Sequence, residues 1–393
     1  MLLRNQRTNP RRHRNEAIMY RNFDINHTNM AKGLAIFLLL AYHLFENEAL
    51  VTAMNVNYAP FPLQAFLLIT SFGNICVAVF VFLTAFGIAS GLLAQGGFSA
   101  GKSASGQSSP LSGSVHPAGG ISPADACRQA ARRFLALALQ FAALFLSVNL
   151  LWWHRFDYRS LYGPGKQGIL FFLTDATGLS APFDTPTLNE TWWYMELAYL
   201  LIFLVPLLTW LVQKTGYALL LFTVFAPFAV TFHPDLKRYL FVAVFGVCAA
   251  YGKWPHRLLT LKLPRVLQWL IGIPGFVLCI LIRQNIVVQE YFIHLTDAPM
   301  ALFLVWLAAA LLGSIPFAGK LLAFIGKHSM NIYLVHTFFY MTLWREFVYY
   351  FKYALITWLL LLTTCLLYSV LLEWLKKITG LNKLLTRIKT ISK

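Results

Sequence analysis

Charged residues are scarce in this chain, and acidic residues are scarcest of all. Only 12% of the 393 residues are charged and just 15 are acidic, whereas 58% are hydrophobic. A soluble globular domain carries about 25% charged residues, so this composition excludes that class. Apolar runs long enough to cross a hydrocarbon core of about 30 Å recur along nearly the whole sequence. We therefore expect a polytopic membrane protein.

Cysteine is also scarce and has no pattern. The five cysteines are scattered, and no Cys-x-x-Cys pair occurs. This distribution argues against a disulfide framework and against a thiolate metal site, so we expect no metal. A cleavable signal is not apparent either, because the arginine-rich leader runs into a segment that carries Lys32 and His43 instead of a purely apolar stretch.

The apolar runs predict an all-α fold of about ten transmembrane helices. Helices are expected because each satisfies its backbone hydrogen bonds within one segment. A further stretch, 61–72, could form a re-entrant or interfacial helix. The expected spans are 30–46, 74–94, 134–153, 192–212, 216–232, 239–252, 266–283, 298–313, 322–343 and 354–374.

Positive charge predicts the orientation of the bundle. With a cytoplasmic N-terminus, most of the 32 lysines and arginines fall in cytoplasmic loops and tails, as the positive-inside rule requires. An even number of helices then places both termini in the cytoplasm, in a multi-pass protein of the cell (plasma or inner) membrane. The net charge of +17 is explained by basic segments that face anionic membrane lipid, so we expect no nucleic-acid partner.

The domain organisation follows from the same pattern. We expect a basic cytoplasmic leader at 1–29, a transmembrane domain at 30–374 and a basic cytoplasmic tail at 375–393. Residues 95–127 are rich in Gly, Ser, Ala and Pro, which is typical of a flexible loop. Within them, residues 96–103 match the P-loop pattern, but an apolar helix precedes the match where a P-loop needs a strand. We reject the nucleotide-binding reading.

The first span contains two ionisable residues, Lys32 and His43. Eleven positions amount to three helical turns plus roughly 20°, so both side chains project from one face, about 16 Å apart along the axis. Titratable groups at membrane depth are costly and usually face a protein interior or a water-filled cavity. The pair therefore indicates a functional site.

The spacing Lys32-x10-His43 resembles the Arg/Lys-x10-His signature of the membrane acyltransferase family 3. In that family an arginine is commoner at the first position. Residues 76–86 resemble the family's second-helix pattern Gly-Val-Asp-x-Phe-Phe-x-x-Ser-Gly-Phe, with Ala78 at the aspartate position and Thr84-Ala85 in place of Ser-Gly. These two stretches lie in the expected order and support the resemblance.

Three later stretches extend the resemblance to the C-terminal half. Residues 325–336 are similar to the family's Leu-Gly-x-x-Ser-Tyr-x-x-Tyr-Leu-x-His, and residues 191–196 loosely resemble its Trp-x-x-x-x-Glu helix start. Arg128, Arg132 and Arg133 resemble the family's arginine-rich cytoplasmic loop. These arginines either anchor the loop at the membrane or clamp the phosphates of an acyl donor, for which Arg132 and Arg133 are the candidates.

The resemblance implies transfer of an acyl group, usually acetyl from cytoplasmic acetyl-CoA, to a hydroxyl of a cell-surface glycan or lipid-linked sugar. His43 would then act as general base or carry the acyl group, and Glu46, at i+3, could orient it. Lys32 would meet the phosphates of CoA. The structural alternatives are a lysine that snorkels to the interface and an ordinary loop glutamate.

Further polar residues are candidates for the acceptor side. Ser329, Tyr333 and His336 are spaced i, i+4 and i+7, which places them on one helix stripe that lines a cavity or forms a structural polar zipper. Glu196 is either a partner of the helix dipole or a cavity acid. Trp193 is one of the aromatics beside the external loop 154–190, which form an interfacial belt or stack on sugar rings.

Other functions remain open at this point. A transporter or flippase for a lipid-linked glycan would also carry intramembrane charges, but the two halves of the chain show no convincing repeat. A glycan polymerase would need a large external loop rich in arginine, and a non-catalytic scaffold would not need Lys32 and His43 on one face. The acceptor, the length of the acyl group and the existence of a homo-oligomer are left undecided.

Overall fold

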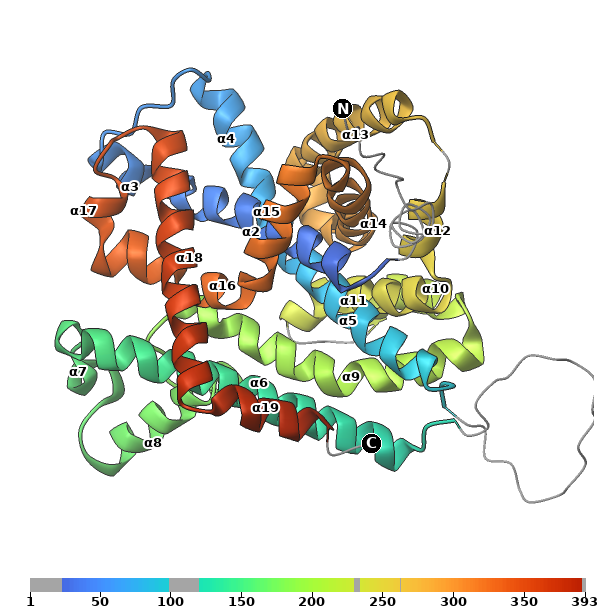
Figure 1. The fold of residues 1–393 in the computed structure, drawn as a ribbon, viewed down its shortest axis with the longest axis horizontal. Coiled ribbons are helices and arrows are strands. Elements are labelled where there is room, and N and C mark those ends of the chain that lie inside the picture. The colour runs from blue at the N-terminus through green and yellow to red at the C-terminus, as the bar shows by residue number, and fades with distance from the viewer. Residues whose placement is uncertain (1–22, 99–119, 230–233, 262, 391–393) are drawn as a thin grey trace, which may run out of the picture.

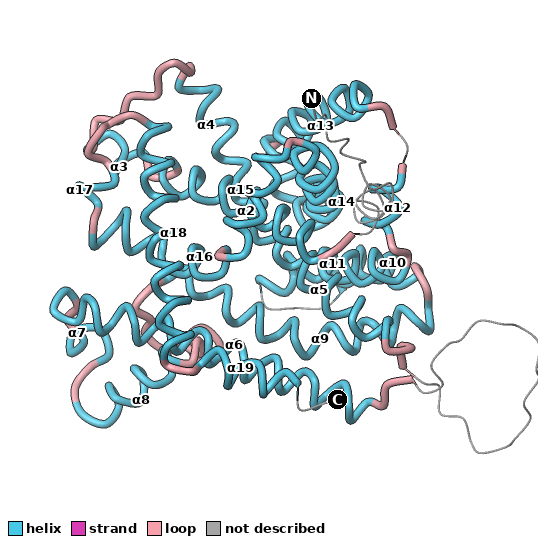
Figure 2. Tube along the Cα trace, viewed as in Figure 1, coloured by secondary structure: helices cyan, strands magenta, loops and turns pink. Residues whose placement is uncertain are grey.

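The computed structural model describes residues 23–98, 120–229, 234–261 and 263–390. Within these ranges the regular elements are helices, and the β-type pairings are two isolated bridges, Asn57 with Tyr353 and Phe98 with Ile121. Figure 1 and Figure 2 show these helices gathered into one bundle, without a strand in the described part. The expected all-α fold is confirmed.

Seven helical stretches of the described ranges are long and apolar enough to cross a membrane, which identifies a membrane protein. Their main helices are α2 (Ile25–Phe45), α5 (Cys76–Ala94), α6 (Pro123–Trp152), α9 (Tyr194–Thr215), α13 (Arg265–Gln284), α14 (Ile293–Trp306) and α18 (Ala354–Ile378).

The expected count of ten transmembrane helices is not reached when helices of the described ranges are judged by length and apolarity. The expected span 216–232 becomes α10 (Ala218–Ala229), which has only 12 residues. The span 239–252 falls in α11 (Pro234–Tyr251) except for its last residue, and the first turn of this helix carries charged residues. The span 322–343 is interrupted at His328, so that α15 (Pro316–Lys327) and α16 (Ser329–Thr337) are separate helices.

Shorter elements connect or extend the long helices. The stretch 61–72, which could form a re-entrant or interfacial helix, contains α4 (Leu63–Ser71), and from Leu63 onward it belongs to the apolar stretch that continues into α5. The short α-helices are α3 (Glu48–Ala53), α4 (Leu63–Ser71), α7 (Tyr158–Tyr162), α8 (Gly165–Ala176), α12 (Trp254–Thr260), α17 (Arg345–Val348) and α19 (Leu381–Thr390). The 3₁₀ and π turns are η1 (Phe72–Ile75), η2 (Trp153–Arg155), η3 (Glu190–Trp193), η4 (Val288–Phe292), η5 (Leu307–Leu311), η6 (Leu312–Ser314) and η7 (Phe338–Leu343).

Helix caps move two of the expected boundaries. The Asp24 carboxylate accepts hydrogen bonds from the backbone N–H groups of Asn26 and His27, so α2 begins inside the segment expected as leader. Ser122 caps α6 in the same way, with Pro123 at its first position, so this helix begins inside the expected loop 95–127. Residues 1–22 of the leader and residues 99–119 of the loop, with most of the P-loop-like match, lie outside the described residues.

Reciprocal glycines bring α2 and α15 into close contact. A Cβ atom on Gly33 would lie 2.0 Å from the carbonyl oxygen of Leu322, and one on Gly326 would lie 1.8 Å from that of Asn29. Each helix thus presents a glycine to the backbone of the other, as small residues do between membrane helices. This contact fixes α15, and with it the start of α16, against the helix that carries Lys32 and His43.

The remaining long helices surround this pair. α5 packs between α2 and α11, and α9 lies beside both α5 and α6. In Figure 1, α6 and α9 run side by side along the lower part of the bundle, and the C-terminal α19 returns onto α6. The tail expected at 375–393 therefore contains a packed helix as far as Thr390.

Candidate active site

His43 and Glu46 form a hydrogen-bonded pair at the end of α2. His43 lies in the last turn of the helix and Glu46 is its C-cap, with His43 Nδ1 2.6 Å from Glu46 Oε1. Because a carboxylate only accepts hydrogen bonds, the imidazole donates from Nδ1, and Nε2 of the neutral ring keeps a free lone pair. That atom has the chemistry of a general base. The side chain of His43 is 20% exposed, so it is accessible.

A second imidazole faces His43 from α16. The ring centroids of His43 and His336 lie 5.0 Å apart, and His336 is fully buried. Nδ1 of His336 lies 2.6 Å from the backbone carbonyl oxygen of Tyr333, so this nitrogen carries the proton. Nε2 of His336 is buried and has no hydrogen-bond partner among the described residues. Nε2 is thus the unprotonated ring nitrogen in both histidines, and the two rings lie next to each other.

The predicted stripe of α16 is present, but its ends have different surroundings. The ring of Tyr333 lies beneath His336, at a centroid distance of 5.9 Å. Ser329 is buried at the first turn, two residues before Asn331, whose amide donates to Ser369 and Glu373 of α18. The structure therefore brings His336 to His43 and Tyr333 to His336, while Ser329 lies at the opposite end of α16.

Lys32 lines a separate cavity of about 420 Å³ near the start of α2. This volume lies within the usual range of ligand pockets, about 300–1,000 Å³. Arg133 of α6 lines the same cavity, and its buried Nη1 atom has no hydrogen-bond partner among the described residues. Gly87 leaves open space there, since a Cβ atom on it would meet nothing within 4 Å. Two cationic side chains expected to meet an acyl donor thus share one cavity.

The other arginines of this segment are placed differently. Arg132 is partly buried but is not one of the residues that line the cavity. Arg128 is exposed and pairs with Asp125, one turn earlier, at 2.6 Å. Of the three arginines before the third span, the structure joins only Arg133 to Lys32.

Aromatic side chains stand between the cavity and the two histidines. Thr84, which lines the cavity, is hydrogen-bonded to Tyr194. The ring of Tyr194 contacts Phe80 at 6.1 Å and Tyr333 at 5.2 Å, and Tyr333 in turn contacts His336. We call Phe80, Tyr194 and Tyr333 the aromatic barrier. Lys32 and His43 share one helix face, but packed rings separate the spaces beside them.

Trp193 and the loop before it form a third, smaller feature, a pocket of about 90 Å³. Asp175 holds this loop by accepting hydrogen bonds from Tyr162, Ser180, Thr187 and the backbone of Leu188. Burial raises the pKa of the Asp175 carboxyl, although these hydrogen bonds oppose the rise.

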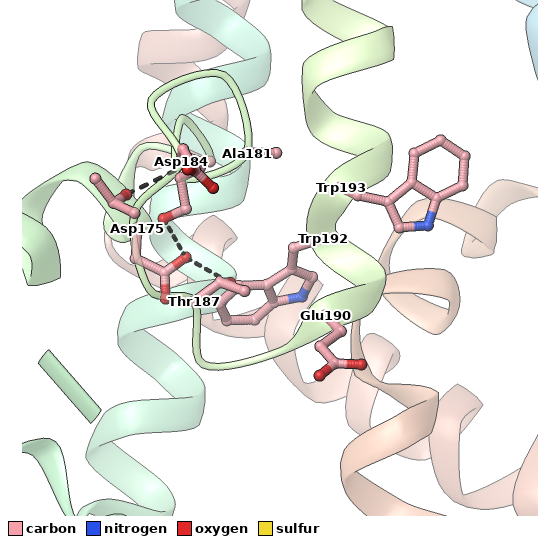
Figure 3. A pocket seen from close by; sticks show the side chains of 10 residues that line it. Asp175, Ala181, Asp184, Thr187, Glu190, Trp192 and Trp193 are labelled. Carbon is pink, nitrogen blue, oxygen red and sulfur yellow. Dashed lines mark hydrogen bonds between the residues drawn. The ribbon is translucent and has the colours of Figure 1, made fainter. Parts of the chain in front are cut away.

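The pocket lies at the point where the loop enters α9. Figure 3 shows the indoles of Trp192 and Trp193 pointing in different directions, with Glu190 near Trp192. Trp192 is anchored, because its indole N–H donates to the carbonyl of Leu334 in α16. Glu196 is partly buried in the first turn of α9. Trp193 and Glu196 thus lie near the element that carries His336, without a direct contact to His43.

The structure also shows polar residues near His43 that the sequence reasoning did not select. Tyr42 makes side-chain hydrogen bonds with Glu46 and with Asn74 of η1. Asn74 accepts a hydrogen bond from Arg283 of α13, and Arg283 pairs with Asp297 of α14. In the sequence, Arg283 and Asp297 lie at the edges of apolar spans. Charged side chains at such positions are costly unless they pair, and this cost could have pointed to the two residues.

One known protein family matches most of the chain. A family model described as an acyltransferase domain, that of acyltransferase 3, matches residues 27–376. No curated protein and no solved structure matches this chain. The matched range includes Lys32 and Arg133 of the cavity, the aromatic barrier and both histidines.

Proposed function

This chain belongs to the acyltransferase 3 family, and from that premise we propose that it transfers an acyl group, most simply acetyl, from cytoplasmic acyl-CoA to a hydroxyl of a glycan. The acceptor is a cell-surface or lipid-linked sugar. The protein resides in the cell membrane with both termini in the cytoplasm. The observation that carries the proposal is the His43–Glu46 pair, whose hydrogen bond leaves the Nε2 lone pair of His43 free.

The reaction needs one base and no net change of charge. Nε2 of His43 accepts the proton of the acceptor hydroxyl, and the oxygen attacks the thioester carbonyl carbon. The new C–O bond forms, the C–S bond breaks, and the proton passes from His43 to the CoA thiolate, which leaves as the thiol. Glu46 holds the imidazole in the required tautomer and stabilises the imidazolium that forms during the transfer.

Lys32 and Arg133 support the acyl-donor end of the proposal. CoA carries several phosphate charges, and the two cations line one cavity. Arg132 would assist from the rim of this site. The length of α2 between Lys32 and His43, about 16 Å, suits a donor whose charged end and thioester are far apart. The aromatic barrier must then move aside when the pantetheine arm enters.

The acceptor end is proposed to use the opposite side of His43. His336 contacts His43 and Tyr333 contacts His336, and His336 offers a hydrogen-bond acceptor to a sugar hydroxyl. Trp193 supplies an aromatic surface for a sugar ring and Glu196 a polar partner. Ser329, at the opposite end of α16 from His336, is not part of this acceptor site. Aromatic faces and carboxylates are the groups that bind carbohydrate through its C–H faces and hydroxyls.

The decisive experiment measures CoA release from acetyl-CoA by purified protein in liposomes, with membrane glycolipids as acceptors. His43→Ala should abolish turnover, and the exposed His154→Ala should not. Turnover that survives in His43→Ala would refute the proposed role of this residue. Glycolipid translocation without CoA release would favour the flippase alternative.

A second comparison tests the acyl-donor site. Lys32→Ala and Arg133→Ala should raise KM for acetyl-CoA by about tenfold or more, which corresponds to about 1.4 kcal/mol of lost binding per tenfold. Arg128→Ala is the matched control, because Arg128 is exposed and paired with Asp125. An equal change of KM in all three variants would contradict a specific site.

A further inference from the structure

A chain of hydrogen bonds connects His43 to a buried ion pair on two other helices. It runs from His43 to Glu46, from Glu46 to Tyr42, from Tyr42 to Asn74 and from Asn74 to Arg283. The Arg283 side chain is almost completely buried and is paired with the fully buried Asp297. The chain thus joins α2, η1, α13 and α14 around the candidate base.

The backbone is built so that this chain can form. A Cβ atom on Gly73 would lie 2.1 Å from the carbonyl oxygen of Leu38 and 2.8 Å from Cβ of Tyr42. Only glycine permits η1 to approach α2 this closely, and the approach brings the neighbouring Asn74 to Tyr42. A side chain at position 73 would push the two segments apart.

The chemistry of the members gives the chain one direction. A guanidinium group only donates, so Nε of Arg283 donates to Oδ1 of Asn74, at 2.6 Å. The amide of Asn74 therefore turns its NH₂ group to the Tyr42 oxygen, and the Tyr42 hydroxyl is left to donate to Glu46. A carboxylate only accepts, so Glu46 accepts from Tyr42 and from Nδ1–H of His43.

We infer that Arg283 and Asn74 are positioning residues that fix the tautomer of His43 through Tyr42 and Glu46. With Arg283 at one end, the donors from Arg283 to Tyr42 all point toward Glu46, so the Tyr42 hydroxyl holds the Glu46 carboxylate beside Nδ1 of His43. The proton of the neutral imidazole then stays on Nδ1. Nε2 is then the basic atom. Asp297 keeps the buried guanidinium charge compensated, which a buried cation requires.

A spectroscopic test needs no substrate. Histidine ¹⁵N chemical shifts distinguish the two neutral tautomers, and the His43 signal among ten histidines is assigned by its loss in His43→Gln. Wild type should show the Nδ1–H form at high pH. Tyr42→Phe and Asn74→Asp should shift the population toward Nε2–H, because the Glu46 side chain, which is 35% exposed, is then no longer held against Nδ1 by the Tyr42 hydroxyl. In Asn74→Asp the new carboxylate accepts from Arg283 and competes with Glu46 for the Tyr42 proton.

A paired variant removes the ion pair without leaving a buried charge. Replacing both members, Arg283→Leu with Asp297→Leu, should preserve folding and still disturb the tautomer of His43. Gln284→Met is the matched control, because the Gln284 side chain donates to Ser71 and so ties α13 to the end of α4, directly before η1, without entering the chain. An equal effect of the control would show that only general packing is involved and would overturn the inference.

The kinetic test rests on the proposed function and can fail separately. Asn74→Asp and the paired variant should lower kcat about 10–100-fold and leave KM for acetyl-CoA unchanged. This is the scale of loss when the hydrogen-bond partner of a metal-bound histidine is replaced. Altered tautomers without any loss of kcat would refute the catalytic significance of the chain. Turnover in His43→Ala would refute the proposed function but leave the tautomer result standing.

Discussion

At the level of single residues, the free Nε2 of His43 depends on the carboxylate beside Nδ1. We expect Glu46→Gln to reduce kcat by up to about 10⁴-fold, the scale seen when the carboxylate that orients a serine-protease histidine is replaced. The glutamine amide can donate as well as accept, so it no longer selects one tautomer. Steady-state CoA release measures the effect.

The neighbouring glutamate provides the control for this prediction. Glu48 is exposed in the first turn of α3, and Glu48→Gln should leave kcat unchanged. If both substitutions lower kcat alike, the effect belongs to the charge of this segment and not to the hydrogen bond at 2.6 Å between His43 and Glu46.

Substitution of Gly87 tests whether the cavity beside Lys32 binds the acyl donor. A leucine there would project into the space that Gly87 now leaves open, so Gly87→Leu should raise KM for acetyl-CoA about tenfold or more. The helix itself gains, because leucine has a higher helix propensity than glycine by roughly 1 kcal/mol. Gly87→Ala adds one methyl group and should have a much smaller effect. Unchanged KM in the leucine variant would exclude this cavity as the acyl-donor site.

At the level of elements, the contact between α2 and α15 is the most sensitive. Gly326→Val should lower the free energy of unfolding by about 1–3 kcal/mol, the usual cost of overpacking, because the new Cβ meets backbone that cannot move aside alone. The midpoint of thermal aggregation in detergent reports the loss. Gly87→Val is the matched control, since it has open space around it. Equal midpoints would show that the two helices tolerate separation.

The elements also show what could be predicted from sequence. The helix that carries Lys32 and His43 was predictable, because helical periodicity is a local property and eleven positions determine a common face. The break of the span 322–343 at His328 was not predictable from apolarity alone, because hydropathy stays high across the π turns and short helices that follow. The cap at Ser122 was present in the sequence as Ser followed by Pro, within a composition that otherwise indicated a loop.

The candidate site shows the same division between local and distant information. His43 with Glu46 is an i, i+3 pair within one helix end, so the sequence could propose it. Asn74, Arg283 and Asp297 come from three separate segments, and only tertiary packing brings them to Tyr42. Arg133 was selected from an arginine cluster, but its difference from Arg132 depends on the rotation of α6 against the cavity.

At the level of the whole molecule, the orientation in the membrane is testable with one native thiol. Cys127 is the exposed cysteine, and the other four are buried. We expect an impermeant maleimide to label Lys166→Cys in intact cells, because residue 166 lies in the loop predicted to be external and is exposed. Cys127 should be labelled only after permeabilisation, since it adjoins the predicted cytoplasmic loop. The reverse pattern would invert the predicted orientation.

The aromatic barrier has a consequence for the energetics of the host cell. In the proposed reaction the acyl-CoA and the sugar approach His43 from opposite sides of the membrane, so an unobstructed route between them would conduct protons and dissipate the transmembrane electrochemical gradient. Phe80, Tyr194 and Tyr333 close that route with contacting rings, at centroid distances of 5.2 to 6.2 Å. The pantetheine arm that carries the acyl group must pass this point, so the same side chains that delay the substrate also insulate the membrane between turnovers.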